Sequence, residues 1–361
     1  MNGDAASTTE ALSAAETAFN TEVLLEPIQP TFRSRATLVW ERIERFLVYA
    51  GDWLNPILVK ETRQALKSFQ FTTTFVLVLA YCWVVTIGGL AYIGPSIFYS
   101  ASGGILLAWY YAALALALVV VVPFSAFRSL ASEREDNTYE LLSITALRPW
   151  QIISGKLGSS IVQMGVYFSA ITPCFAFTYL LRGVDLPTIT VLMVYTFFGS
   201  LGLSMIGVLL ATLSEQRFAQ VFVMVAFLAA LLLICFYSVI GGYMVIEYSY
   251  ALFGGSEFWI FSWAMATAYV TTFALMFFAA AGMISFNTEN RSTPLRICML
   301  VQQAAWIGWM AYAWIVEEYD LAAILVMAMM AAIYWCAMGT MLTGEREGMS
   351  QRVMRRLPNS P

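Results

Sequence analysis

Long apolar runs without Asp, Glu, Lys or Arg constrain this chain more than any other feature of its sequence. An α-helix rises about 1.5 Å per residue, so each run can cross the roughly 30 Å of hydrocarbon in a bilayer. Backbone polar groups inside lipid must be satisfied within the segment, which favours helices. The sequence therefore predicts an all-α polytopic membrane protein with about eight transmembrane helices. The predicted spans are 71–92, 105–127, 157–181, 190–213, 219–246, 259–286, 298–316 and 321–343.

Composition and charge agree with this class and suggest an orientation. Apolar residues make up 60% of the chain and charged residues only 12%, as expected of a membrane protein. Cytoplasmic loops carry an excess of Lys and Arg. If the N-terminus is cytoplasmic, Arg182 is the only basic residue after residue 46 on the outer side. We expect the chain in the inner (plasma) membrane with both termini cytoplasmic. Nucleic acid is not an expected partner, because no basic patch with interleaved aromatic residues is present.

The chain divides by composition into consecutive parts. Residues 1–32 are polar and acidic and contain no Lys or Arg, so we expect a disordered tail. Residues 33–70 show a helical apolar period and are predicted to form cytoplasmic amphipathic helices, placed either at the membrane interface or against a partner. A six-span core covers 71–287, an additional two-span hairpin covers 288–343, and a cytoplasmic tail covers 344–361.

A short amphipathic helix is predicted directly before the first span. Asn55 is a good N-cap, and Pro56 suits the first helical position. The pattern places Leu58 and Leu66 on an apolar face and Glu61 on the opposite, charged face. Both an elbow helix lying on the inner leaflet and a plain cytoplasmic extension of the first span fit this pattern. The residues assigned to the elbow helix are Asn55, Pro56, Lys60, Glu61 and Arg63.

Several kinds of chemistry are absent from the sequence. There is no histidine, which excludes His-based catalysis and His metal sites. No G-x-x-x-x-G-K-[ST] loop is present to hold nucleotide phosphates. The predicted spans carry no ionisable Asp, Glu, Lys or Arg of the kind that ion-coupled carriers use. We therefore expect no catalytic residue, metal or cofactor in this chain, and any ATP hydrolysis requires a separate subunit that binds ATP and Mg²⁺.

The segment from Glu133 to Lys156 is charged and strongly punctuated, although it lies between two apolar spans. An acidic run leads into a short amphipathic helix, Arg148-Pro149 ends it, and a second helix begins there and enters the next span. A plain solvated loop is the alternative interpretation. Pro123 and Pro173 lie in the spans on either side and are predicted to kink them. The fourth span carries a small-residue pattern that would allow close helix packing, formed by Gly199, Ser200, Gly202 and Ser204.

This segment resembles the intracellular coupling helix of the type-2 (exporter-like) ATP-binding-cassette permease family. The family pattern is a charged run, T-x-E-L-L, T-x-L, a proline break and then G-K, and Asn137 replaces the usual glycine before the first threonine. The helix that begins at Asn55-Pro56 resembles the elbow helix of the same family. The resemblance covers about residues 55–287. The matching residues are Thr138, Glu140, Leu141, Leu142, Thr145, Leu147, Pro149, Gly155 and Lys156.

The resemblance implies a transmembrane permease subunit that couples ATP hydrolysis on a separate ATPase subunit to export. It implies pairing with a second permease subunit, identical or related, and docking of the coupling helix on the ATPase, with Lys156 reaching lipid headgroups. The hairpin 288–343 is an addition to the family's six spans. The alternative is a non-transporting membrane scaffold or assembly factor. The predicted docking residues are Glu133, Glu135, Asp136, Thr138, Tyr139, Glu140, Leu141, Leu142, Thr145, Leu147, Arg148 and Pro149.

Overall fold

The computed structural model describes residues 56–94, 102–135, 149–213, 217–249, 253–285, 292–316 and 321–344. Within these ranges the chain forms helices and no strands. All of them belong to one unit, Asn55–Pro361. The predicted disordered tail 1–32, the amphipathic stretch before the elbow helix, and nearly all of the tail 344–361 lie outside the described residues.

Six membrane-length apolar helices are present within the described ranges. The all-helical, multi-pass class is therefore confirmed, whereas the count of eight spans stays a prediction. The C-terminal helices α13 (Ser292–Ile315) and α14 (Leu321–Gly344) are not among the six, although α14 contains the shorter apolar stretch Ile324–Cys336. The six are α4 (Phe69–Ile93), the continuous unit α5 (Gly103–Ala115), η2 (Leu116–Val121) and α6 (Val122–Glu135), and then α8 (Pro149–Leu180), α9 (Leu186–Leu213), α10 (Arg217–Glu247) and α12 (Ser256–Ile284).

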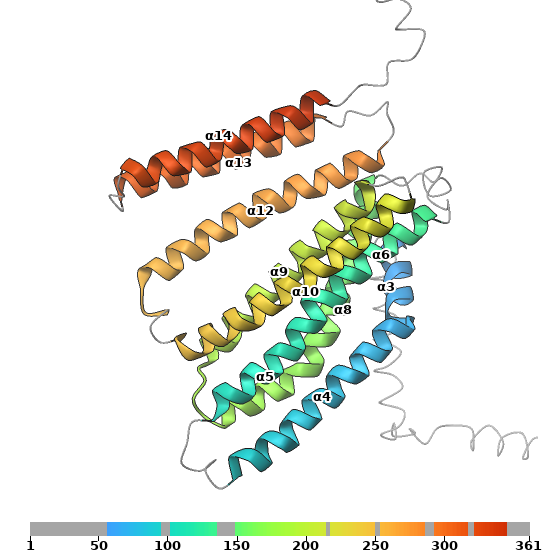
Figure 1. Ribbon diagram of the computed structural model, residues 1–361, viewed down its shortest axis with the longest axis vertical. Helices are drawn as coiled ribbons and strands as arrows, with labels where there is room; N and C mark the ends of the chain where they lie inside the picture. Colours follow the sequence, from blue (N-terminus) through green and yellow to red (C-terminus); the bar gives the residue numbers. More distant parts are fainter. Residues whose placement is uncertain are drawn as a thin grey trace, which may run out of the picture. The chain divides into compact units, whose positions relative to one another are not determined.

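The unit α5–η2–α6 is the central helix of the bundle. It contacts α4, α8, α9 and α10 (Figure 1). Its α5 and η2 segments are apolar around their circumference, which suits an interior rather than a polar surface, and the unit supplies much of the core. Its fully buried large side chains are Leu107, Tyr110, Leu114, Leu118, Phe127 and Leu130.

The central helix changes to π geometry just before Pro123. In η2 the Val122 N–H donates to the Ala117 carbonyl, five residues back. The next donor in this pattern would be residue 123, but proline has no N–H, so the Leu118 carbonyl lacks that donor. Ser200 Oγ on α9 donates to this carbonyl at 2.5 Å. A hydroxyl from a neighbouring helix thus satisfies a backbone acceptor that lipid could not.

Small residues on α9 allow it to pack closely against α6. A Cβ added to Gly207 would lie 3.0 Å from the Pro123 carbonyl oxygen. Ser200 and Ser204 are fully buried on the same face, so the predicted use of small residues is confirmed for these serines. The prediction is wrong for Gly199, where an added Cβ would meet nothing within 4 Å. Gly199 lies about 100° around the helix from Ser200 and so faces away from α6.

The hairpin α13–α14 packs against α12 (Figure 1). The Trp309 indole N–H donates to Thr267 Oγ1 at 2.8 Å, and Gln302 Nε2 donates to Thr272 Oγ1 at 3.0 Å. From α14, Tyr334 OH donates to Gln302 Oε1 at 2.5 Å. Side-chain hydrogen bonds can join helices in lipid, which offers few competing partners. The additional hairpin therefore extends the bundle on the α12 side.

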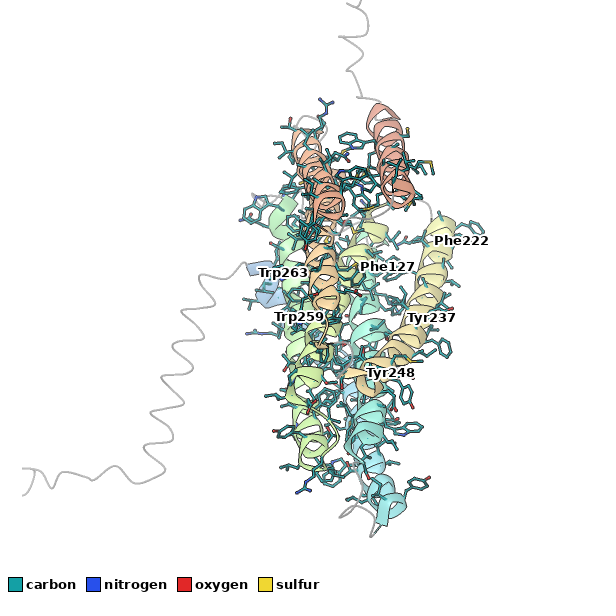
Figure 2. The ribbon with its side chains drawn as sticks, turned by 90° about the vertical axis from the view of Figure 1, so that its left-hand side faces the viewer. Phe127, Phe222, Tyr237, Tyr248, Trp259 and Trp263 are labelled. Atoms are coloured by element: carbon teal, nitrogen blue, oxygen red, sulfur yellow. The ribbon has the colours of Figure 1, made fainter. Side chains whose placement is uncertain are left out.

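Aromatic side chains cover the outer surface of α10 (Figure 2). Phe222 is 69% exposed, Tyr237 is 63% exposed, and Tyr248, just beyond the end of the helix, is 57% exposed. Phe127 of the central helix, by contrast, is only 1% exposed. Apolar side chains fit a hydrocarbon environment, and tyrosine near the end of a span fits the membrane interface. The surface of α10 is thus suited to contact with lipid.

Candidate functional site

Both ends of the predicted docking segment lie in described helices, whereas its middle does not. Glu133 and Glu135 lie in the last turn of α6, and Pro149 is the first residue of α8. The predicted restart of a helix at Trp150, directly after the break, is confirmed to within one residue, since α8 already includes Pro149 in its first turn, where a missing N–H costs nothing. The remaining predicted residues lie outside the described ranges: Asp136, Thr138, Tyr139, Glu140, Leu141, Leu142, Thr145, Leu147 and Arg148.

A buried ion cluster joins the helices at this end of the bundle. Lys156 Nζ of α8 lies 3.0 Å from Glu133 Oε2 of α6. The same ammonium lies 3.3 Å from Glu61 Oε1 of α3 (Pro56–Lys67). Lys156 and Glu61 are only 2% and 7% exposed. The prediction that Lys156 reaches lipid headgroups is wrong, because its ammonium is enclosed by two carboxylates.

Ser129 of α6 completes this group, which we call the Lys156 cluster (Glu61, Ser129, Glu133 and Lys156). Lys156 Nζ donates to Ser129 Oγ at 2.8 Å, and Ser129 Oγ donates to Glu61 Oε2 at 2.9 Å. One ammonium thus faces two carboxylates, with a hydroxyl between the partners. Buried charges are tolerated only when they are paired and hydrogen-bonded in this way.

Helix α3 lies along the start of α8, and two glycines allow the close approach. A Cβ on Gly155 would lie 2.8 Å from Ile57 Cγ2, and one on Gly158 would lie 2.5 Å from Leu58 Cδ1. The prediction that Glu61 belongs to the charged outer face is wrong, since it lies one turn after the buried Ile57 and points the same way.

The other predicted elbow residues have mixed outcomes. Pro56 is the first residue of α3, as predicted, and Lys60 and Arg63 are exposed. Asn55 lies outside the described residues. The helix ends at Lys67, and Ser68 caps α4 by accepting a hydrogen bond from the Phe71 N–H at 3.2 Å.

A polar cavity of about 410 Å³ adjoins the Lys156 cluster. Further polar side chains line it deeper in the bundle, where Ser125 Oγ donates to Gln163 Oε1 at 3.1 Å and Gln163 Nε2 donates to Ser159 Oγ at 3.4 Å. Gln163 is 3% exposed. The side-chain amide is therefore satisfied by hydroxyls from α6 and α8, and the polar region continues along both helices.

The end of α6 is also tied to α9 and α10. Arg134 Nη1 donates to the Thr212 carbonyl near the end of α9 at 2.9 Å. Gln220 Nε2, in the first turn of α10, donates to the Ala131 carbonyl at 3.2 Å. Together with the Lys156 cluster, these bonds connect the end of α6 to four other helices. A displacement of this end would therefore be felt by α3, α8, α9 and α10.

The chemistry of the site is that of a structural link. The Lys156 cluster combines one ammonium with two carboxylates and a hydroxyl, and the guanidinium of Arg128 also lines the adjoining cavity. Among the described residues, no group of three or more His, Cys, Asp and Glu is placed to hold a metal ion. Ion pairs and hydrogen bonds between helix ends can transmit a displacement from one helix to the next.

The spacing of polar residues in the sequence also indicates this cluster, independently of the coupling-helix motif. On α6, Ser125, Ser129 and Glu133 recur every four residues and so lie on one helix face. A second polar stripe begins at Lys156 on α8 and continues through Ser159, Ser160 and Gln163. Two polar stripes on neighbouring membrane helices should face each other, because lipid does not solvate them.

Comparisons with protein-family models, curated proteins and solved structures found no match for this chain.

Proposed function

We propose that this chain is the permease subunit of a type-2 ATP-binding-cassette exporter. It would work with a separate ATPase subunit that binds ATP and Mg²⁺, and with a second permease subunit. The family resemblance of residues 133–156 and 55–63 supports this function. The multi-pass helical bundle is the architecture that such a subunit requires.

One observation carries the proposal: both ends of the segment 136–148 are joined to the same buried cluster. Glu133 lies three residues before this segment, Lys156 lies two turns into the helix that follows it, and their charged atoms are 3.0 Å apart. A segment that merely connected two spans would need no such junction. A segment that receives a push from a partner does need one, because α6 and α8 must move together.

The proposed mechanism follows the covalent and ionic connections of the cluster. Closure of the ATPase subunits on ATP displaces the segment 136–148. The displacement reaches α6 and α8 directly, and Glu61 passes it to α3 through the Lys156 ammonium. In α6 it travels toward η2, where the helical hydrogen-bond pattern is already interrupted. Irregular helix segments are common points of bending. The α5 part of the central helix, on the other side of η2 from α6, can therefore reorient.

Docking of the ATPase is assigned to the apolar positions of the predicted coupling helix. The test is co-purification in mild detergent of the tagged chain with the ATPase, followed by an ATP hydrolysis assay. We expect a stoichiometric ATPase with the wild-type chain and its loss in the double variant Leu141→Asp, Leu142→Asp. Desolvating two carboxylates in an apolar cleft is strongly unfavourable, which is why the double variant should fail to bind.

A matched control separates docking from folding. Ser143→Asp introduces a carboxylate at a polar position of the same segment and should retain the ATPase. All variants must elute as monodisperse protein in gel filtration. Recovery of a monodisperse double variant with normal ATPase content contradicts the docking assignment. Recovery of the wild-type chain with no ATPase at all favours the scaffold alternative.

A further inference from the structure

The antiparallel helices α12 and α13 line a partly open cavity of about 670 Å³, whose wall also includes Met327 of α14. This volume lies within the roughly 300–1,000 Å³ typical of small-molecule sites. Small side chains create the space, since Ala264 and Ala268 of α12 and Ala305 of α13 all line it. This cavity is separate from the Lys156 cluster. It shares no lining residue with the polar cavity of about 410 Å³ that adjoins that cluster.

The register of the two helices divides the cavity into two halves. Thr272 pairs with Gln302, and Thr267 pairs with Trp309 five residues earlier on α12. These bonds close the half nearer the start of α13. Continued in the same register, Tyr312 lies opposite Ala264, and the cavity extends past this level to Glu257 in the first turn of α12.

The end of the cavity at Glu257 has the chemistry of a cation site. Phe261 and Tyr312 line it together with this carboxylate. Aromatic faces attract ammonium groups, and an acidic side chain adds charge complementarity. Among the described residues, no Lys or Arg forms an ion pair with Glu257. The rest of the wall is mainly apolar, formed by alanines, Ile260, Trp306 and Met327, and is suited to a hydrocarbon chain.

We propose that this cavity binds a membrane phospholipid with an ammonium headgroup. The ammonium lies against Glu257 and the neighbouring aromatic rings, and one acyl chain lies along the alanine-lined wall toward Thr267. The occupant is a lipid because the cavity lies between helices of a membrane bundle and combines a charged end with an apolar length. The site does not depend on the ATPase partner, so it goes beyond the proposed transport function.

Native mass spectrometry of the full-length chain tests the site. The protein is released from mixed micelles that contain equal amounts of phosphatidylethanolamine and phosphatidylglycerol with the same acyl chains. Glu257 is exposed at the open end of the cavity, so we expect the wild-type chain to retain the ethanolamine lipid in roughly threefold to fivefold preference, as a solvent-exposed ammonium contact would give. Glu257→Gln should remove the preference, because it keeps the shape of the side chain and removes its charge.

Two further variants make the outcome decisive. Glu247→Gln neutralises an exposed carboxylate at the end of α10 and should keep the preference. Ala264→Leu fills the wall between Glu257 and Thr267, where the acyl chain is placed, and should reduce retention of both lipids. Equal retention of the two lipids by the wild-type chain would overturn the proposal. So would an unchanged preference in Glu257→Gln, which would leave this carboxylate a role at the N-terminus of α12 only.

Discussion

Replacing Lys156 by methionine should destabilise the protein strongly, because it leaves two carboxylates without their ammonium. The Glu61 and Glu133 side chains are only 8% and 16% exposed, so water replaces the lysine poorly as a partner for them. Ser129 Oγ still donates to Glu61 at 2.9 Å, but one neutral hydrogen bond does not balance a buried charge. The methionine fills most of the lysine volume, so packing changes little.

The magnitude follows from the burial of the partners. Removing one member of a buried ion pair costs about 3–5 kcal/mol, and the low exposure of Glu61 places Lys156→Met in this range. Adding Glu61→Gln removes the more deeply buried carboxylate and should recover part of the loss. The coupling energy between the two substitutions should then be about 1–3 kcal/mol, as found for residues in direct contact.

The assay is equilibrium unfolding of the purified chain in mixed lipid–detergent micelles, carried out for the wild type, both single variants and the double variant. Lys67→Met is the matched control, because Lys67 is exposed at the end of α3 and its loss should change little. A loss below about 1 kcal/mol for Lys156→Met would refute the reasoning, since the ammonium would then not compensate buried charge.

Two further predictions concern helix packing and are measured by the same unfolding assay. Gly155→Ala places a methyl group 2.8 Å from Ile57 Cγ2 and should cost about 1–3 kcal/mol; Gly165→Ala in the same helix meets nothing within 4 Å and should be neutral or stabilising by up to about 1 kcal/mol. Equal effects of the two would contradict the close approach of α3. Ser200→Ala leaves the Leu118 carbonyl without its hydroxyl donor and should cost about 1–3 kcal/mol; Ser169→Ala, which removes an exposed hydroxyl bonded to the Val166 carbonyl of its own helix, should cost less, and equal losses would argue against the Ser200 hydrogen bond.

The helical class could be predicted from the sequence because hydrocarbon imposes a length and a composition that few other environments require. The start of α8 at Pro149 was predictable for a local reason, since proline suits a first helical turn. The π segment before Pro123 was predicted only as a kink. Its geometry depends on Ser200, a residue of another span, and such a partner cannot be identified from local propensity.

The candidate site was predictable in position but not in its internal pairing. The motif identified both edges of the segment 136–148, yet it assigned Lys156 to the headgroups and Glu61 to the outer face of α3. Both assignments treated each helix as facing water or lipid. In the structure each charge compensates the other at 3.3 Å, and this pairing depends on α3 lying on Gly155 and Gly158. Tertiary packing therefore reversed the local expectation.

The most direct test of the central claim is site-specific photocrosslinking from Leu142 in the native membrane. A benzoylphenylalanine at this position should crosslink to one partner that carries an ATP-binding P-loop, and the crosslink should depend on nucleotide. The same probe at Tyr237, which is exposed on α10, should give no such product. If Leu142 crosslinks to no ATPase while the chain is folded and inserted, this chain is not the permease subunit we propose.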